Sequence, residues 1–243
     1  MEDKIIGRNP VMEAIRSGRE IDKIIVKKGN YEGSIVPIIK LAKDKGIIIQ
    51  EAEKQKLDAF AEGGNHQGVV AFAATHEYVT VQDILNSCTE KEKPPFLIIC
   101  DKITDPHNLG SILRTANCVG ADGVIIPKRS SVGLNAVVAK TSAGAVEYTP
   151  VAKVTNIAQT IDMLKDKGIW VAGADMDGGD MYKANLTGAL ALVVGSEGEG
   201  ISRLVREKCD FLVKIPMFGQ INSLNASVAA AVLMYEISRQ QRA

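Results

Sequence analysis

The chain has 243 residues, of which 46% are hydrophobic, and its 29 basic residues are balanced by 29 acidic ones. This size and apolar content predict one large or two modest globular domains with ordinary cores. Because there is no excess of positive charge, any contact with a nucleic acid would have to come from local basic patches. No apolar run approaches the roughly 20 residues of a membrane span.

Two further expectations concern the cell compartment and metals. The opening MEDKIIGRNP lacks the apolar centre of a signal peptide, which predicts a cytoplasmic protein. The four cysteines have no paired spacing, so we expect reduced packing residues rather than a disulfide framework or a zinc site. They are Cys88, Cys100, Cys118 and Cys209.

The first 75 residues alternate short helical and extended patterns, which predicts a small α/β domain. Asn9-Pro10 favours a helix start and Gly18 favours its end. We expect helices at residues 11–17, 34–45 and 54–60, and strands at residues 23–27, 47–50 and 69–73.

Residues 76–95 are polar and end in Pro94-Pro95, whose rings stiffen the entry to the next strand. We expect a domain linker there, with a helical turn within residues 81–85. From residue 96 onward apolar strands alternate with helices, which indicates a parallel sheet covered on both faces. The expected strands are 96–100, 124–126, 169–174, 190–194 and 211–215, and the expected helices are 109–119, 136–143, 156–167, 202–208 and 225–239.

The run VKIPMFGQINSLNASVAAAVLMYEISR, residues 213–239, is the most specific stretch in the chain. A strand ends at Pro216, which cannot continue a ladder, and a loop with turn-forming residues follows. Asn225 can cap the next helix, and the residues from Ala226 to Tyr235 are nearly all apolar. We therefore expect a helix that is buried on every side, against the core and against a partner subunit.

Two further loops follow predicted strands. Residues 195–200 read GSEGEG, whose glycine spacing is the reverse of a dinucleotide fingerprint and whose Glu197 would repel a pyrophosphate. An acidic loop of this kind suits a cationic ligand better, although it is also consistent with a plain tight turn. The segment from Asp101 to Asn108 lies where open α/β sheets place ligands, and Asn108 is expected to cap the helix that carries Arg114.

Three of these segments, NLGSILRTA, GSEGEG and IPM with SLNASVA, resemble in order the three motifs of the SpoU/TrmH family. The family consists of S-adenosylmethionine-dependent RNA 2′-O-methyltransferases of the SPOUT class. The resemblance implies a parallel sheet with a C-terminal trefoil knot over residues 96–243. Residues 1–75 resemble the L30e-like RNA-binding domain attached to the bacterial 23S rRNA guanosine methyltransferases of this family, with residues 76–95 as the linker.

The resemblance also implies roles for individual residues. Arg114 matches the catalytic arginine, and Asn108 matches the asparagine that helps hold it and the acceptor ribose. Glu197, Ser223 and Asn225 would orient these groups or shape the loops. The implied contacts to S-adenosylmethionine are Gly195, Ile215, Met217, Ser223, Leu224, Asn225 and Ala226.

A basic cluster in the first domain is the candidate RNA contact, although such clusters are more often solvated faces. Its members are Arg8, Arg16, Arg19, Lys23, Lys27 and Lys28, of which Arg8, Arg16, Lys27 and Lys28 are the expected RNA contacts. The expected activity is methylation of a ribose, of guanosine in 23S rRNA, by a homodimer. The alternatives are a tRNA ribose methyltransferase, a catalytically silent RNA-binding factor and, least favoured, a dinucleotide-dependent dehydrogenase.

Overall fold

The computed structural model describes residues 3–29, 31–74 and 76–242. They form two compact units. The N-terminal unit comprises residues 1–77 and 133–136, and the C-terminal unit comprises residues 78–132 and 137–243. Each unit has its own sheet and its own core.

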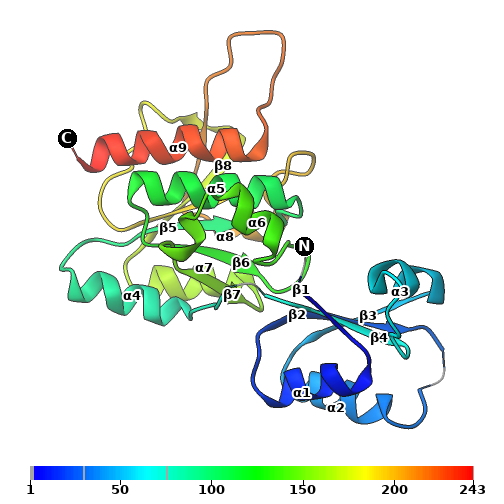
Figure 1. The fold of residues 1–243 in the computed structure, drawn as a ribbon. Helices are drawn as coiled ribbons and strands as arrows, with labels where there is room; N and C mark the ends of the chain where they lie inside the picture. Colours follow the sequence, from blue (N-terminus) through cyan, green and yellow to red (C-terminus); the bar gives the residue numbers. More distant parts are fainter. Residues whose placement is uncertain (1–2, 30, 75, 243) are drawn as a thin grey trace. The chain divides into compact units, whose positions relative to one another are not determined.

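The N-terminal unit contains a sheet of four strands in the order β1-β4-β2-β3, in which β2 and β3 are parallel and β4 is antiparallel to both of its neighbours. Alternate residues of β2 and β4 point to opposite faces, so each face has a core of its own. Helices α1 and α2 cover one face, and α3 covers the other (Figure 1). The elements are β1 (Asp3–Ile6), α1 (Arg8–Arg16), β2 (Ile21–Lys27), α2 (Ile35–Asp44), β3 (Ile48–Ala52), α3 (Lys54–Ala61) and β4 (Val69–Ala73).

Two details of this unit differ from the expectation. Helix α1 begins at Arg8 with Gly7 as its N-cap, so Asn9 and Pro10 both lie inside the first turn. Gly7 has a φ of 98°, a conformation that favours glycine. The short strand β1 was not expected, because its four residues give too little alternation to be recognised.

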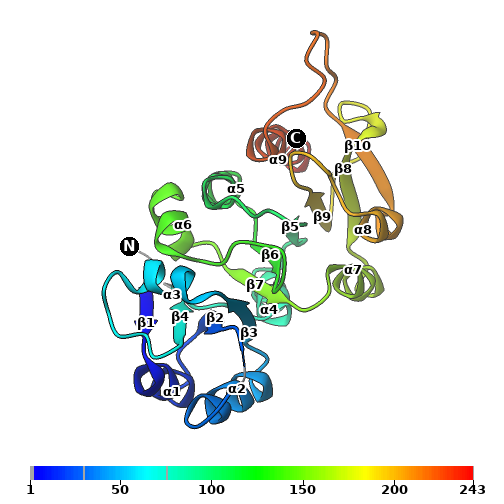
Figure 2. The same ribbon diagram turned by 90° about the vertical axis from the view of Figure 1, so that its right-hand side faces the viewer.

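The C-terminal unit contains a sheet of six parallel strands in the order β10-β8-β9-β5-β6-β7, which confirms the expected parallel α/β architecture. Helices α4, α7 and α8 pack on one face, and α5, α6 and α9 lie on the other (Figure 2). The elements are α4 (Val81–Glu90), β5 (Phe96–Cys100), α5 (Pro106–Val119), β6 (Gly123–Pro127), α6 (Ala136–Thr141), η1 (Ala145–Glu147), β7 (Val151–Val154), α7 (Ile157–Asp166), β8 (Trp170–Asp180), β9 (Leu190–Val194), α8 (Arg203–Lys208), β10 (Phe211–Lys214) and α9 (Ala226–Gln241).

The segment that was expected to be a linker instead contains a helix of ten residues. Thr80 and Asp83 form a capping box that starts α4, and Val81, Ile84 and Leu85 belong to the core beneath the six-stranded sheet. Ile84 fills the space beside Gly123, where a Cβ atom would lie 2.5 Å from its Cδ1. Residues 78–95 are therefore part of the C-terminal unit.

Parallel strands all end at the same edge of a sheet, and this places the candidate motifs together. The loops after β5, β9 and β10 leave that edge, although the first and last of these are far apart in the sequence. The part of the chain that the structure describes contains no helix long and apolar enough to cross a membrane.

Candidate active site

Two loops and the start of α9 enclose a cavity of about 610 Å³ at the carboxyl edge of the six-stranded sheet. This volume lies within the range of small-molecule sites in proteins, about 300–1,000 Å³. Its walls come from the end of β9 with the loop after it, from the end of β10 with the loop after it, from the middle of β8 and from α9. The lining residues include Gly195, Ile215, Met217, Ser223, Leu224 and Ala226, all of them expected cofactor contacts.

The loop after β9 is held in a tight closed form. Ser196 and Gly200 exchange backbone hydrogen bonds of 3.2 and 3.0 Å, which bring the two ends of the loop together. Gly195 lies against this closure, and a Cβ atom there would be 2.0 Å from the carbonyl carbon of Gly200. Only glycine fits at position 195, whereas a Cβ atom on Gly198 would meet nothing within 4 Å.

Three side chains from three distant segments meet at the side of this cavity. Asn108 Nδ2 donates to Glu197 Oε1 over 2.9 Å. Asn225 Nδ2 donates to Asn108 Oδ1 over 3.0 Å and also to Glu197 Oε1. We call this group the amide–carboxylate network, and it joins α5, the loop after β9 and the start of α9.

Asn225 also caps α9 through its side-chain oxygen, as expected. Asn225 Oδ1 accepts from the backbone N–H of Ser227 over 2.9 Å and of Val228 over 3.3 Å. The same amide group therefore fixes the helix start and contacts the other two loops. Any shift of α9 would move the network with it.

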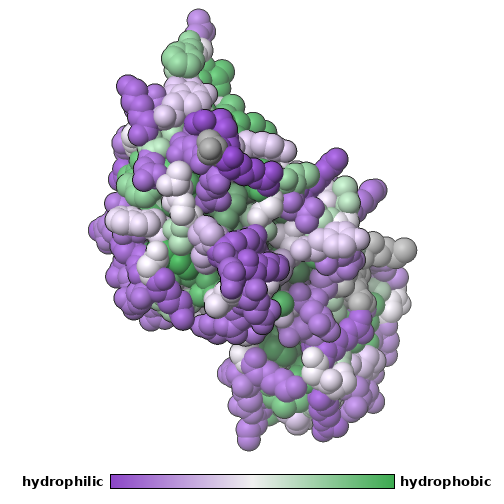
Figure 3. All heavy atoms as spheres, turned by 90° about the vertical axis from the view of Figure 1, so that its left-hand side faces the viewer, coloured by the Kyte–Doolittle hydropathy of each residue, from purple (hydrophilic) through white to green (hydrophobic). Residues whose placement is uncertain are grey.

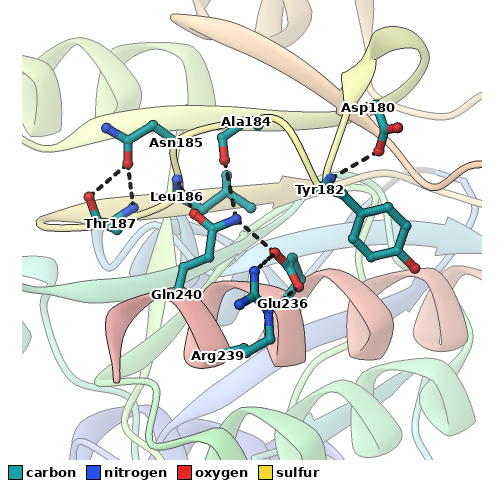
Figure 4. Close-up of polar contacts among 9 residues, drawn as sticks. All are labelled: Asp180, Tyr182, Ala184, Asn185, Leu186, Thr187, Glu236, Arg239 and Gln240. Carbon is teal, nitrogen blue, oxygen red and sulfur yellow. Dashed lines mark hydrogen bonds and ion pairs between the residues drawn. The ribbon is translucent and has the colours of Figure 1, made fainter. Parts of the chain in front are cut away.

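The far end of α9 is fixed as well (Figure 4). Gln240 donates from Nε2 to the backbone oxygen of Ala184 over 3.2 Å and accepts from the backbone N–H of Leu186 over 2.9 Å. The buried Glu236 carboxylate accepts from Gln240 and from the Arg239 guanidinium, and the hydrogen bond from Arg239 holds the pKa of Glu236 below its ordinary value. The helix is thus tied at both ends to the connections around the sheet.

Asn108 is not the helix cap that we expected. Asp105 caps α5, accepting from the backbone N–H of His107 over 2.9 Å, and Pro106 takes the first helical position. Asn108 lies within the first turn and is 8% exposed, so a buried amide needs the partners that Glu197 and Asn225 provide.

This correction changes the relation between Asn108 and Arg114. At about 100° per residue, the six residues between them turn the helix through about 600°, which leaves the side chains about 120° apart. Arg114 is exposed on α5 and lies outside the amide–carboxylate network of this chain. Arg114 therefore lies on a different face of α5 from Asn108.

The loop after β5 holds the loop after β9 at two further points. The buried Asp101 carboxylate accepts from the backbone N–H of Ser202 over 2.7 Å, at the start of α8. Lys102 Nζ lies 2.9 Å from Glu199 Oε2. This ion pair raises the pKa of Lys102 and lowers the pKa of Glu199.

The chemistry of the cavity fits the expected cofactor. Carboxylates of Asp175 and Glu199 border it, which suits a cationic sulfonium, while Ile215, Met217 and Leu224 supply apolar surface for a nucleoside. Asp175 was missed in the sequence, because it lies in a strand that extends six residues beyond its expected end and follows no recognisable motif. Arg206 on α8 holds this part of β8 by pairing with Asp175 and Asp177.

The expected RNA contacts of the N-terminal unit divide into two kinds. Arg8 is structural, since its guanidinium donates to the Gln67 backbone oxygen over 2.9 Å and to Ser34 Oγ over 3.1 Å. Arg16 and Lys28 form ion pairs at the surface with Glu13 and Glu53, and Lys27 is exposed. Exposed pairs of this kind exchange partners at little energetic cost, so the structure leaves these three residues accessible to an anionic ligand.

The fit at Gly195 gives a direct test of the cavity. Gly195→Ala forces the loop after β9 to open, and displacements of about 1 Å in a binding site can lower function by about a hundredfold. We therefore expect calorimetry to show that the affinity of this variant for S-adenosylmethionine is lowered by more than about tenfold. Gly198→Ala, on the same loop, is the matched control and should bind as the unaltered chain does. If both variants bind S-adenosylmethionine as tightly as the unaltered chain, with unchanged circular dichroism, the ligand must bind elsewhere.

Comparisons with known proteins agree with this geometry. The family model described as the SpoU rRNA methylase family matches residues 95–235, and the model described as RNA 2′-O ribose methyltransferase substrate binding matches residues 4–79. The TrmH family tRNA/rRNA methyltransferase YacO of Bacillus subtilis is 49% identical over 241 residues, covering 98% of this chain and 96% of YacO. A TrmH family tRNA/rRNA methyltransferase of Staphylococcus aureus is 52% identical over 244 residues, covering 99% of this chain and 98% of its own length.

Among solved structures, the SpoU methyltransferase AviRb of Streptomyces viridochromogenes in complex with AdoMet has a TM-score of 0.62 at 23% identity, covering 98% of this chain and 90% of AviRb. An AdoMet-bound rRNA methyltransferase of Sinorhizobium meliloti has a TM-score of 0.61 at 22% identity, covering 97% and 86%. Both of these neighbours contain bound S-adenosylmethionine, and their likeness to this chain confirms the fold. The chain belongs to the SpoU rRNA methylase family of RNA ribose 2′-O-methyltransferases.

Proposed function

We propose that this chain methylates the 2′-hydroxyl of a guanosine in 23S rRNA and binds S-adenosylmethionine in the 610 Å³ cavity. The observation that carries the proposal is the amide–carboxylate network, because it places polar side chains from all three motifs beside a cavity suited to a sulfonium nucleoside. Bound there, S-adenosylmethionine supplies an electrophilic methyl group. The chain itself has to align the acceptor ribose and to accommodate the proton that leaves its hydroxyl.

Backbone groups at Gly195, Ile215 and Leu224 would hold the cofactor, since all three residues line the cavity. Met217 and Ala226 would cover its apolar parts, and Ser223 would border the acceptor. Asn108, Glu197 and Asn225 would hold the ribose hydroxyls by hydrogen bonds. The trefoil knot of the SPOUT class stays a prediction for this chain.

Arg114 would act as a cation rather than as a base. A guanidinium keeps its proton throughout the accessible pH range, but its planar fork can bind a phosphate in bidentate fashion. We propose that Arg114 grips the phosphate next to the acceptor ribose and stabilises the oxygen as it loses its proton, which leaves to phosphate or water.

The choice of rRNA over tRNA rests on the N-terminal unit. Residues 4–79 match a substrate-binding model, and they form a separate α/β unit of the kind that the rRNA enzymes carry. Exposed Arg16, Lys27 and Lys28 would contact RNA there. A tRNA ribose is the second candidate substrate, because the similar bacterial proteins are named for both. The chain would act in the cytoplasm, where rRNA is made and assembled.

We also propose that the chain works as a homodimer through the outer face of α9. Val228 and Tyr235, seven residues apart on one side of the helix, are 47% and 58% exposed. Phe218 and Ile221 on the loop before α9 are exposed too, and hydrophobic patches lie beside hydrophilic ones on the projecting loop at the top of Figure 3. A second copy would bury this apolar surface close to the cofactor cavity.

Methyl transfer from labelled S-adenosylmethionine into undermodified total RNA tests the function. We expect label in 23S rRNA, recovered as 2′-O-methylguanosine after nucleoside analysis. Label in the tRNA fraction would favour the second substrate. Absence of label from naked RNA and from ribosomal particles, with the cofactor still bound, would support a catalytically silent RNA-binding factor.

Arg114→Lys tests the role of the guanidinium. Because lysine keeps the charge but loses the bidentate fork, we expect turnover to fall by about a hundredfold, as on loss of one transition-state donor. Turnover measured from pH 7 to 9 should stay low and flat. A rate that rises with pH would instead make residue 114 a base, and near-normal turnover would exclude the bidentate contact.

Light scattering tests the dimer. The unaltered chain should have a solution mass about twice its 26.1 kDa, and Tyr235→Asp should halve that mass because a charge cannot be buried unpaired in an apolar interface. Leu204→Asp, at a 53% exposed position on α8, is the control and should leave the mass unchanged. A fully active monomer of the unaltered chain would contradict the proposal.

A further inference from the structure

Lys102 occupies an unusual place beside the active site. It is the second residue after β5 and has a φ of 58°, a left-handed conformation that costs a residue with a side chain about 1–2 kcal/mol. Its neighbours Asp101 and Ile103 are buried, so the backbone of Lys102 is fixed while its side chain reaches outward. Strain of this kind at a site motivates a search for a functional reason.

The side chain of Lys102 reaches across to the loop after β9. Its Nζ lies 2.9 Å from Glu199 Oε2, and Glu199 borders the cavity. Glu197, two residues earlier on the same loop, belongs to the amide–carboxylate network. The Lys102–Glu199 pair therefore lies at the edge of the region where the acceptor ribose has to enter.

The pair contributes little to the stability of the fold. The two side chains are 42% and 74% exposed, and exposed ion pairs of this kind are typically worth about 0.2–1 kcal/mol. The closure of the loop is already provided by backbone hydrogen bonds between Ser196 and Gly200 and by the contact of Asp101 with Ser202. Lys102 can therefore leave Glu199 without opening the loop.

The acidity of this edge raises a problem for an RNA substrate. Glu197 and Glu199 lie next to the place where a ribose and its flanking phosphates would be held, and like charges repel. Lys102 is the cation that the structure pairs with one of these carboxylates. A phosphodiester that arrives with the ribose offers Lys102 an anion of the same charge in place of Glu199.

We infer that Lys102 is an RNA-phosphate contact at the mouth of the active site, and that Glu199 is a built-in competitor that holds Lys102 when no RNA is bound. The inference rests on the proposed function. On RNA binding, Lys102 moves from the carboxylate of Glu199 to a phosphate flanking the target nucleotide. No covalent bond changes in this step.

A purely structural role for Lys102 makes a different prediction. If the pair only fixed the loop, removal of either partner would have the same effect, and both variants would weaken cofactor and RNA binding together. If Glu199 competes with phosphate, removal of Glu199 frees Lys102. The two substitutions then act on RNA binding in opposite directions.

The test compares Lys102→Gln with Glu199→Gln in the full chain loaded with S-adenosylmethionine. Binding of a 23S rRNA transcript is measured over a series of salt concentrations, together with KM for the transcript and kcat. Lys102→Gln should weaken RNA binding about fivefold and reduce the slope of log K against log salt by about 0.7–0.9, the value of one phosphate contact. Glu199→Gln, measured at saturating S-adenosylmethionine because Glu199 borders the cofactor cavity, should tighten RNA binding, and Lys102→Gln should leave cofactor affinity unchanged.

Lys167→Gln is the matched control. It makes the same charge change just before β8, at the opposite edge of the sheet from the cavity. It should leave the salt slope unchanged.

Unaltered RNA binding in Lys102→Gln, or weakened binding in both Lys102→Gln and Glu199→Gln, would overturn the inference even if the unaltered chain methylates the transcript. Failure of the unaltered chain to bind and methylate any RNA would instead overturn the proposed function, and the inference with it.

Discussion

The carboxylate of Glu197 is the point on which the arrangement of the active site depends. It accepts hydrogen bonds from Asn108 on α5 and from Asn225 at the start of α9, and the two asparagines also bond to each other. Asn108 is nearly buried, so without these partners its amide would be left unsatisfied at a cost of about 1–3 kcal/mol. The network thus joins three segments of the chain, the first and last of which lie more than a hundred residues apart in the sequence.

The surrounding contacts keep this point rigid. Gly195 allows the loop that carries Glu197 to close on itself, because any side chain at that position would collide with Gly200. Helix α9 is tied by Asn225 at one end and by Gln240 at the other, which limits movement of the helix along its axis. A rigid cavity suits a reaction that depends on the alignment of donor and acceptor. The exposed Lys102–Glu199 pair is the part that can rearrange.

The sequence predicts the parallel sheet because its strands are apolar runs, and the expected bounds of β5 and β9 agree with the structure. Helix α4 was mistaken for a linker because the segment carries a charged run and ends in Pro94-Pro95. The signal that was overlooked is a set of apolar residues at helical spacing, all of them buried in the structure: Val81, Ile84, Leu85 and Cys88. Asn108 was placed as a cap because it precedes an apolar run, although Asp105-Pro106 is the stronger start. The motifs identify the site residues, but only the folded chain shows that Asn108, Glu197 and Asn225 touch.

Calorimetry of S-adenosylmethionine binding to two variants of Glu197 tests the central claim most directly. In Glu197→Gln the amide oxygen can still accept from Asn108 and Asn225, so the loops should stay joined and affinity should fall only a few-fold. In Glu197→Ala both hydrogen bonds are lost, and at about 1.5–3 kcal/mol for a bond to a charged group we expect affinity to fall more than tenfold. Binding by Glu197→Ala that equals the unaltered chain would contradict the account.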